Sequence, residues 1–271
     1  DAIGLNEALE LLSPYYDVVL LEGHKTTPLV DKVWLLKDGK EECPSDIPNI
    51  LRVLGRDEDR AAILMDMLMP WLTKKCLTTP VYAGILIGGK SRRMGQPKHL
   101  VHTGDGRTWV ELAAACATPL VKQVVILGKG EIPRPAEHIP LLPDVDDAQG
   151  PLAGMLAAMR WNPDVAWLFM SCDMPRITAD AIRWLLSHRK PGVWAVLPRR
   201  AKPNVVEPFP AWYDSRSRHL LEACRGPAGI AGQAKVATPS IPGDILNAWA
   251  NVNTVSELEA VMPSRSGITR K

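Results

Sequence analysis

A regular alternation of short apolar runs and amphipathic stretches after residue 80 limits the possible folds of this chain more than any other pattern in it. Short runs rich in Val, Ile and Leu predict buried strands, and helical spacing of apolar residues predicts the helices between them. The expected strands are residues 81–87, 123–127, 165–170 and 192–197, and the expected helices are residues 108–117, 152–160 and 178–187. This succession is typical of a mostly parallel sheet with helices on both faces. We therefore expect an α/β fold whose ligand site lies beyond the carboxyl ends of the strands.

The charge of the first 80 residues differs from that of the rest, which predicts a separate module. These residues contain 9 Lys and Arg against 14 Asp and Glu, whereas the remainder contains 23 against 16. The patterns predict a helix near Asn6, strands at 16–22, 32–37 and 50–54, a helix over 57–75 and a linker over 76–80. We place the domain boundary between residues 79 and 80, giving domains 1–79 and 80–271. The proline-rich residues 191–210 are expected to form an irregular loop, and residues 256–262 a final helix.

Composition excludes several classes of protein. The five cysteines are scattered and never form a Cys-x-x-Cys pair, which argues against a disulfide framework and a thiolate zinc site and fits a reducing cytoplasm. No apolar run approaches the roughly 20 residues of a membrane helix, so we expect no membrane partner. The net charge of +2 suggests no nucleic-acid partner. The chain begins with Asp1 rather than Met, so we expect further sequence upstream.

A glycine-rich basic segment follows the strand expected at 81–87. Adjacent Gly88 and Gly89 would let the backbone approach a ligand closely and turn its N–H groups toward a phosphate or a base. Three glycines, two arginines and two lysines lie within residues 86–98, enough donor capacity for a triphosphate. The segment matches neither the P-loop nor the Gly-x-Gly-x-x-Gly pattern. The alternative is a surface turn with solvated basic side chains.

Two acidic residues follow expected strands. Asp173 follows the apolar run 165–170 after Ser171 and Cys172. This position puts its carboxylate at the sheet edge where a hard cation bridging phosphates would bind. Asp144 follows a shorter apolar run. For each residue the alternative role is to cap a helix or a turn.

Four motifs in this order resemble the signature of the molybdenum cofactor guanylyltransferases. They are LIGGKSRRMGxxK (86–98), Asp144 followed by GPLAG (150–154), CDMP (172–175) and NVNT (251–254). The resemblance covers about residues 81–262. It implies a Rossmann-like nucleotidyltransferase with a mostly parallel sheet, which transfers GMP from GTP to molybdopterin with Mg²⁺ and releases pyrophosphate. Molybdoenzymes or cofactor-delivery proteins would be its further partners.

The resemblance also implies roles for individual residues. Arg93, Lys98 and Asp173 would be catalytic, with Asp173 also binding the metal and Arg93 stabilising the triphosphate as charge builds on the leaving pyrophosphate. Asn251 and Asn253 would lie on the acceptor side. The nucleotide would be bound by Leu86, Ile87, Gly88, Gly89, Lys98, Asp144 and Asp173.

The chain departs from the family pattern at several positions. Ile87 stands where the family often has Ala, the second strand ends in Leu127-Gly128 without the Asn that can touch the nucleotide, and residues 202–208 match the pterin-side loop only loosely. Two alternatives therefore stay open. One is a molybdenum cofactor cytidylyltransferase that uses CTP, and the other is a non-catalytic protein that binds and delivers the cofactor.

Residues 16–25 and 32–36 resemble the second half of the molybdopterin-guanine dinucleotide adaptor protein, a GTP-binding partner of the guanylyltransferase. We expect domain 1–79 to be the C-terminal part of such an adaptor, a partial α/β segment in a natural fusion whose P-loop half precedes Asp1. Glu22 and Lys25 would then form no complete nucleotide site in this chain. The alternative is a generic strand with an exposed acidic end.

Overall fold

The computed structural model describes residues 4–88, 97–254 and 256–257. Its contacts divide the chain into two compact units, Asp1–Cys76 and Leu77–Lys271. Among the described residues, no helix is both long and apolar enough to cross a membrane.

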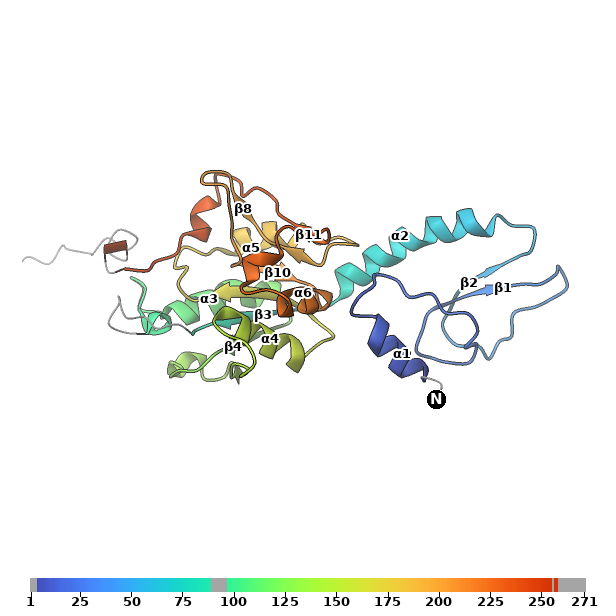
Figure 1. Cartoon of the computed structure of the whole chain (residues 1–271), viewed down its shortest axis with the longest axis horizontal. Coiled ribbons are helices and arrows are strands. Elements are labelled where there is room, and N and C mark those ends of the chain that lie inside the picture. Colours follow the sequence, from blue (N-terminus) through green and yellow to red (C-terminus); the bar gives the residue numbers. More distant parts are fainter. Residues whose placement is uncertain (1–3, 89–96, 255, 258–271) are drawn as a thin grey trace, which may run out of the picture. The chain divides into compact units, whose positions relative to one another are not determined.

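The first unit contains a short parallel strand pair and two helices (Figure 1). Helix α1 (Leu5–Leu12) precedes strands β1 (Lys32–Leu35) and β2 (Ile50–Leu54), and helix α2 (Arg60–Thr78) follows them. Both strands were predicted. Of the described apolar residues in this unit, only Leu54 is fully buried. The unit therefore has little hydrophobic core of its own.

Two predictions for this part of the chain are wrong. Residues 16–22 form no strand, because no strand among the described residues pairs with them, and Leu20 is 90% exposed. An unpaired extended segment cannot satisfy its backbone N–H and C=O groups within a sheet. The predicted linker over 76–80 is also mostly helical, since α2 continues to Thr78. The helix stops just before Pro80, whose ring disfavours the helical conformation of the preceding residue.

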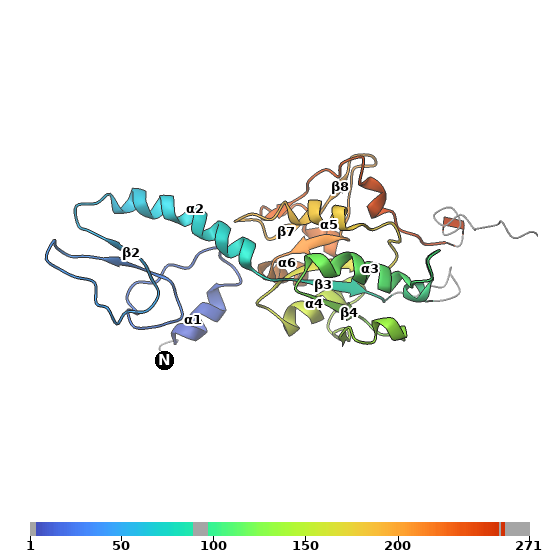
Figure 2. The ribbon, with the colours of Figure 1, turned by 180° about the vertical axis from the view of Figure 1, so that it is seen from behind.

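The second unit is built on a seven-stranded sheet (Figures 1 and 2). The spatial order is β11 (Val236–Ala237), β7 (Ala195–Val196), β10 (Ala211–Tyr213), β6 (Ala166–Ser171), β3 (Val81–Leu86), β4 (Gln123–Leu127) and β5 (Leu141–Leu142). Strand β10 runs antiparallel to both of its neighbours, and all other adjacent pairs are parallel. The predicted mostly parallel α/β sheet is confirmed.

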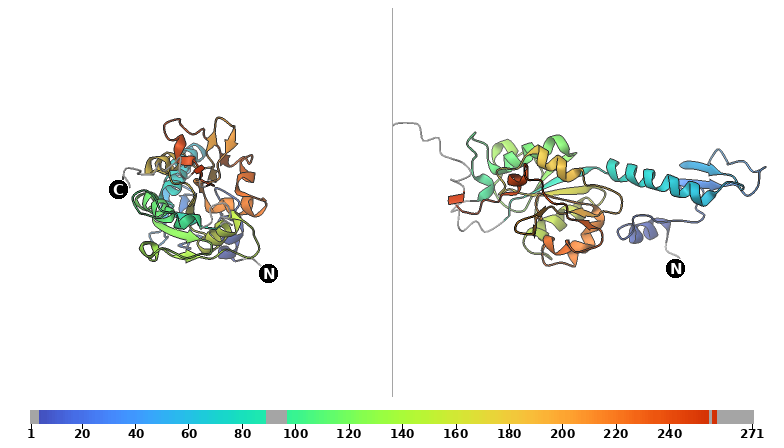
Figure 3. Two further views of the ribbon diagram at one scale, coloured as in Figure 1. Left: turned by 90° about the vertical axis from the view of Figure 1, so that its left-hand side faces the viewer. Right: turned by 90° about the horizontal axis from the view of Figure 1, so that it is seen from above.

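Helices cover both faces of this sheet, as predicted (Figure 3). Helices α3 (Trp109–Ala117) and α5 (Ala179–Leu186) pack on one face, and α4 (Pro151–Trp161) and α6 (Arg218–Glu222) pack on the other. In β6, Leu168 and Met170 belong to the first of these two cores, whereas Trp167 and Phe169 belong to the second. Alternate residues of a strand point to opposite faces, so the continuous apolar run fills two cores at once.

The proline-rich stretch 191–210 is more ordered than predicted. It contains β7 and an antiparallel hairpin of β8 (Arg199–Arg200) and β9 (Val205–Val206). The strand predicted over 192–197 is shortened to Ala195–Val196, which precedes Pro198, a residue without a backbone N–H. The helix predicted over 256–262 lies almost wholly outside the described residues. Short 3₁₀ helices complete the unit: η1 (Lys98–Leu100), η2 (Thr118–Leu120), η3 (Arg134–Ala136), η4 (Ser215–Ser217), η5 (Pro227–Ile230) and η6 (Leu246–Trp249).

Candidate active site

The site lies where the carboxyl ends of β3 and β6 meet. The two strands are parallel neighbours with Leu86 opposite Ser171, and the backbone N–H of Cys172 donates to the carbonyl of Leu86 at 3.2 Å. The chain continues from β3 to β4 on one side, whereas β6 lies on the other side of β3. This is a topological switch point of the sheet, where α/β folds open a crevice for ligands.

Lys98 and Asp173 form the polar centre of this edge. Lys98 Nζ donates to Asp173 Oδ2 at 2.8 Å, and Ser171 Oγ donates to Asp173 Oδ1 at 2.6 Å. The side chains of Lys98 and Asp173 are only 18% and 17% exposed. Lys98 opens helix η1, and Asp173 lies two residues beyond the end of β6. The ion pair is therefore partly shielded from water, which strengthens its electrostatic interaction.

Asn253 joins the same network from the far end of the chain. Its Oδ1 accepts a hydrogen bond from Lys98 Nζ at 2.7 Å, and the backbone N–H of Val252 donates to the carbonyl of Asp173 at 2.9 Å. This backbone bond holds the 251–253 segment against the end of β6. One of the two expected acceptor-side asparagines and two of the three expected catalytic residues thus lie together.

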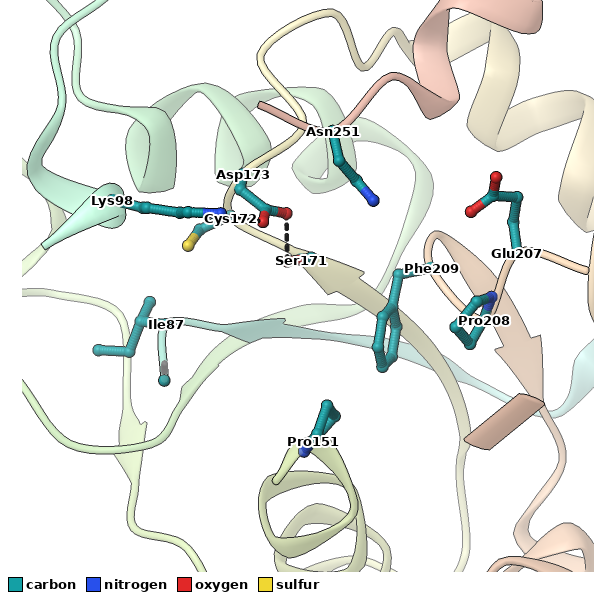
Figure 4. A pocket seen from close by; sticks show the side chains of 11 residues that line it. Ile87, Lys98, Pro151, Ser171, Cys172, Asp173, Glu207, Pro208, Phe209 and Asn251 are labelled. Carbon is teal, nitrogen blue, oxygen red and sulfur yellow. Dashed lines mark hydrogen bonds and ion pairs between the residues drawn. The ribbon is translucent and has the colours of Figure 1, made fainter. Parts of the chain in front are cut away.

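A pocket of about 320 Å³ opens beside this network (Figure 4). Pockets of this size bind small molecules in many enzymes. It is lined by Ile87, Gly88, Lys98, Pro151, Ser171, Cys172, Asp173, Glu207, Pro208, Phe209 and Asn251. In the close-up Lys98 and Ile87 lie on one side of Asp173, and Glu207 and Pro208 lie on the other. The lining of the pocket thus divides at Asp173 into an Ile87–Lys98 side and a Glu207–Pro208 side, which we call its two arms.

Several other residues that were expected to bind the nucleotide do not line this pocket or lie outside the described residues. Leu86 is the last residue of β3, and Asp144 follows the edge strand β5, but neither lines the pocket. Asp144 is beside the first turn of α4: a Cβ built on Gly154 would lie 3.2 Å from Asp144 Oδ1. The same Cβ would be 2.8 Å from Leu86 Cδ2. The absence of a side chain at Gly154 therefore provides the space that the side chains of Asp144 and Leu86 occupy. Gly89 and Arg93 lie outside the described residues.

Some site residues were missed from the sequence. Ser171, which orients the Asp173 carboxylate, could have been found from its position two residues before Asp173 on the same strand end. Phe209 carries no such signal, and Pro151 was quoted only as part of the GPLAG motif, without a role. Their approach to Asp173 depends on how the 207–210 segment and the start of α4 pack against the sheet. Glu207 was named only within the loop that matches the pterin side loosely.

Cys172 lines the pocket but is not poised as a nucleophile. Burial, reinforced by the negative charge of Asp173, raises the pKa of its thiol to about 12, although Lys98 opposes the shift. Only the thiolate is strongly nucleophilic, so this thiol is inert near neutral pH.

The described residues contain no group of three or more His, Cys, Asp or Glu side chains that could hold a metal ion by themselves. Asp173 nevertheless offers a carboxylate at the mouth of the crevice, with lone pairs beyond those that accept from Lys98 and Ser171. Mg²⁺ is commonly held by one or two carboxylates together with substrate phosphates and water. Asp173 fits that kind of site.

Comparison with known proteins decides the family. The model of the MobA-like NTP transferase domain matches residues 83–265. The chain belongs to this family. The chain, called the transferase below, is accordingly a nucleotidyltransferase of the molybdenum cofactor guanylyltransferase type, as the ordered motifs predicted.

Individual relatives support this family assignment. The transferase is 31% identical over 191 residues to a "Probable molybdenum cofactor guanylyltransferase" of Bacillus cereus, covering 65% of this chain and 93% of the relative. It is 28% identical over 145 residues to a "Molybdenum cofactor biosynthesis bifunctional protein" of Synechocystis sp., covering 53% of this chain but only 42% of that protein. The chain therefore spans less than half the length of this bifunctional relative.

A solved structure shares the fold. The molybdopterin-guanine dinucleotide biosynthesis protein A of Archaeoglobus fulgidus superposes with a TM-score of 0.56 at 22% identity, covering 67% of the transferase and 97% of the archaeal chain. The family model leaves residues 1–82 unmatched, so their resemblance to the adaptor protein stays a prediction.

Proposed function

We propose that the transferase joins GMP from GTP to molybdopterin, forming the guanine dinucleotide cofactor and releasing pyrophosphate. The observation that carries the proposal is the contact of Lys98 with both Asp173 and Asn253 at the carboxyl ends of β3 and β6. It brings Asp173 and Asn253, from two of the family motifs, within hydrogen-bond distance of Lys98, which belongs to a third. The names of the relatives, which specify guanylyl transfer, support the choice of nucleotide.

Lys98 is suited to bind the phosphates. An ammonium group carries three N–H donors, of which Asp173 and Asn253 engage two among the described residues. No described residue takes the third donor, which would be available, with the positive charge, to a phosphate oxygen. A charge-assisted bond of this kind is stronger than a neutral one, and partial burial strengthens it further.

The nucleotide would occupy the arm of the pocket at Ile87 and Gly88. Here the chain leaves β3 and lines the pocket with Ile87 and Gly88, and the N–H of Ile87 is already satisfied by the carbonyl of Leu127 at 3.0 Å. Gly128 at the end of β4 has φ +120°, and a Cβ there would lie 3.3 Å from the backbone N of Gly88. Glycine at position 128 thus keeps the space beside the Gly88 amide open.

Asp173 would hold Mg²⁺ on the triphosphate. When bound, the ion would neutralise charge on the phosphates as pyrophosphate departs. Ser171 and Lys98 fix the carboxylate from two sides, so the residue is oriented before substrates arrive. This pre-organisation reduces the entropy cost of assembling the reacting groups.

The bond changes are simple. An oxygen of the molybdopterin phosphate attacks the α-phosphorus of GTP, the bond between that phosphorus and the α–β bridging oxygen breaks, and pyrophosphate leaves with the bond's electrons. The product contains a new P–O–P link between GMP and molybdopterin. No side-chain nucleophile is needed, so this chain's residues act by positioning and by charge neutralisation. Arg93, expected to face the leaving group, lies outside the described residues.

Two measurements test this function. Calorimetry with GTP, CTP and ATP in Mg²⁺ should give the tightest binding for GTP, and tighter binding of CTP would favour the cytidylyltransferase instead. Pyrophosphate release should require both GTP and molybdopterin. Nucleotide binding without any release of pyrophosphate would favour the delivery protein.

A further inference from the structure

Glu207 presents a carboxylate to the arm of the pocket opposite Ile87 and Lys98 (Figure 4). It directly follows β9, and its backbone N–H donates to the carbonyl of Pro198 at 2.7 Å, which anchors the residue on the β8–β9 hairpin. Its side chain is 12% exposed. A carboxylate that is largely shielded from water is stabilised by hydrogen-bond donors to its oxygens.

One of those oxygens is held within the fold. Arg200 Nε pairs with Glu207 Oε1, and Arg200 Nη2 donates to the carbonyl of Trp249, so the arginine is anchored at two points. Among the described residues, no side chain or backbone donor reaches Oε2. Arg200 therefore orients the carboxylate and leaves acceptor capacity on the pocket side.

We propose that Glu207 recognises the acceptor by its ring: the carboxylate accepts hydrogen bonds from the 2-amino group and the adjacent ring N–H of the pterin. The inference rests on the proposed function. These two donors lie side by side on the edge of a 2-amino-4-oxopyrimidine and match the two oxygens of a carboxylate. A site built around such donors strongly disfavours an analogue that lacks one of them, because a buried acceptor is then unpaired.

Guanine carries the same edge, but the geometry assigns Glu207 to the acceptor. The two phosphates that react must meet at Asp173 and Lys98. The rings attached to them then extend into different arms of the pocket, and the nucleotide arm is the one at Ile87 and Gly88. Phe209, two residues after Glu207, lines the same pocket and offers the apolar face of its ring to a flat heterocycle.

The test compares Glu207→Gln with the wild-type chain, with Glu137→Gln at an exposed position as the matched control. In Glu207→Gln we expect the KM for molybdopterin to rise about tenfold or more while the KM for GTP changes by less than about twofold. A molybdopterin KM within about twofold of wild type, or an equal rise in both KM values, would overturn the proposal.

A second readout separates recognition from a structural effect. Inhibition by 6-hydroxymethylpterin is compared with inhibition by 6-hydroxymethyllumazine, which carries a carbonyl in place of the 2-amino group. The wild-type chain should prefer the pterin by about tenfold, and Glu207→Gln should lower this preference to less than about threefold. Equal effects of the two compounds on the wild-type chain, including no inhibition by either, would overturn the proposal.

Failure of the proposed function has a different signature. Wild-type protein that releases no pyrophosphate from GTP and molybdopterin would refute the transfer reaction before any variant is compared. Active wild-type protein with an unchanged Glu207→Gln variant would refute only the role of Glu207.

Discussion

The Nζ atom of Lys98 lies 2.8 Å from Oδ2 of Asp173, although the two residues are 75 positions apart in the sequence. Lys98 ends the glycine-rich segment and Asp173 follows β6, so the contact ties the expected phosphate-binding residue to the expected metal ligand. Both side chains are less than one fifth exposed. A cation and a carboxylate held together in this way can bind a phosphate and its metal at a single point.

Replacing Asp173 with Asn should nearly abolish pyrophosphate release. The amide keeps the shape of the side chain but removes the negative charge needed to hold Mg²⁺, and we expect turnover to fall about 100-fold or more. The control is Asp180→Asn, at a side chain that is 79% exposed on α5. Turnover of Asp173→Asn within about tenfold of wild type would mean that the metal binds elsewhere.

Replacing Lys98 with Ala should weaken nucleotide binding. Loss of the ammonium removes a charge-assisted bond to phosphate and leaves Asp173 without its cation, so we expect the Kd for GTP to rise about 10- to 100-fold by calorimetry. The exposed Lys122, on the opposite end of the sheet immediately before β4, provides the control Lys122→Ala. Equal affinities of Lys98→Ala and the control would contradict the assignment.

Replacing Gly84 with Ala should destabilise the second unit. A Cβ at this position of β3 would lie 2.6 Å from Leu127 Cδ1 and 2.8 Å from Phe169 Cδ1, inside the core that α4 covers. Phe169 is stacked on Trp167 with ring centroids 5.5 Å apart, so it has little room to move. We expect the free energy of unfolding to fall by about 1–3 kcal/mol in urea titrations.

The control for this substitution is Gly232→Ala. A Cβ there meets nothing within 4 Å, so its stability should equal or slightly exceed that of the wild type. If the two alanine variants unfold at the same urea concentration, the core around Gly84 can accommodate a Cβ and the predicted steric conflict is wrong.

The raised pKa of Cys172 predicts resistance to alkylation. With a pKa of about 12 the thiol stays protonated through pH 8 to 10, and thiolate appears only as the pH approaches that value. Iodoacetamide should therefore label the less buried Cys43 well before Cys172 in native protein, as read by peptide mass spectrometry. Rapid labelling of Cys172 at pH 8 would contradict the burial of this thiol.

The same shift has a consequence for stability. A thiol whose pKa is higher in the folded chain than its ordinary value of about 8.5 contributes stability that is complete below that value and is lost as the pH rises toward the folded pKa. Unfolding free energy should therefore decrease from about pH 8.5 upward, and Cys172→Ala should make that decrease shallower. An identical pH dependence in the variant would assign the decrease to other groups.

Much of the second unit follows from local sequence alone. Strand β4 begins and ends where its apolar run predicted, and Thr108 caps α3 through a reciprocal hydrogen bond with Glu111 that a Thr-x-x-Glu spacing favours. Long apolar runs bounded by turn residues predict strands well because the folded chain must bury each of them. The short strands are different: β8 and β9 contain two residues each, and their pairing depends on contacts that no local pattern encodes.

Residues 16–22 show the converse error. Their Val- and Leu-rich sequence favours a strand, yet a strand exists only when a neighbour pairs with its backbone, and no strand among the described residues does so. These residues have strand propensity, but they lack a described strand to pair with.

The class of fold, the family and the identity of the residues at the sheet edge follow from the sequence, because alternating apolar segments and ordered motifs are local properties of the chain. Which of these residues touch depends on the tertiary structure. Lys98, Asp173 and Asn253 meet because β3 and β6 are parallel neighbours, and Val252 bonds to the end of β6. Glu207 enters the same pocket because the β8–β9 hairpin and Arg200 carry it there. Such contacts depend on packing between distant segments, which the linear order of residues does not specify.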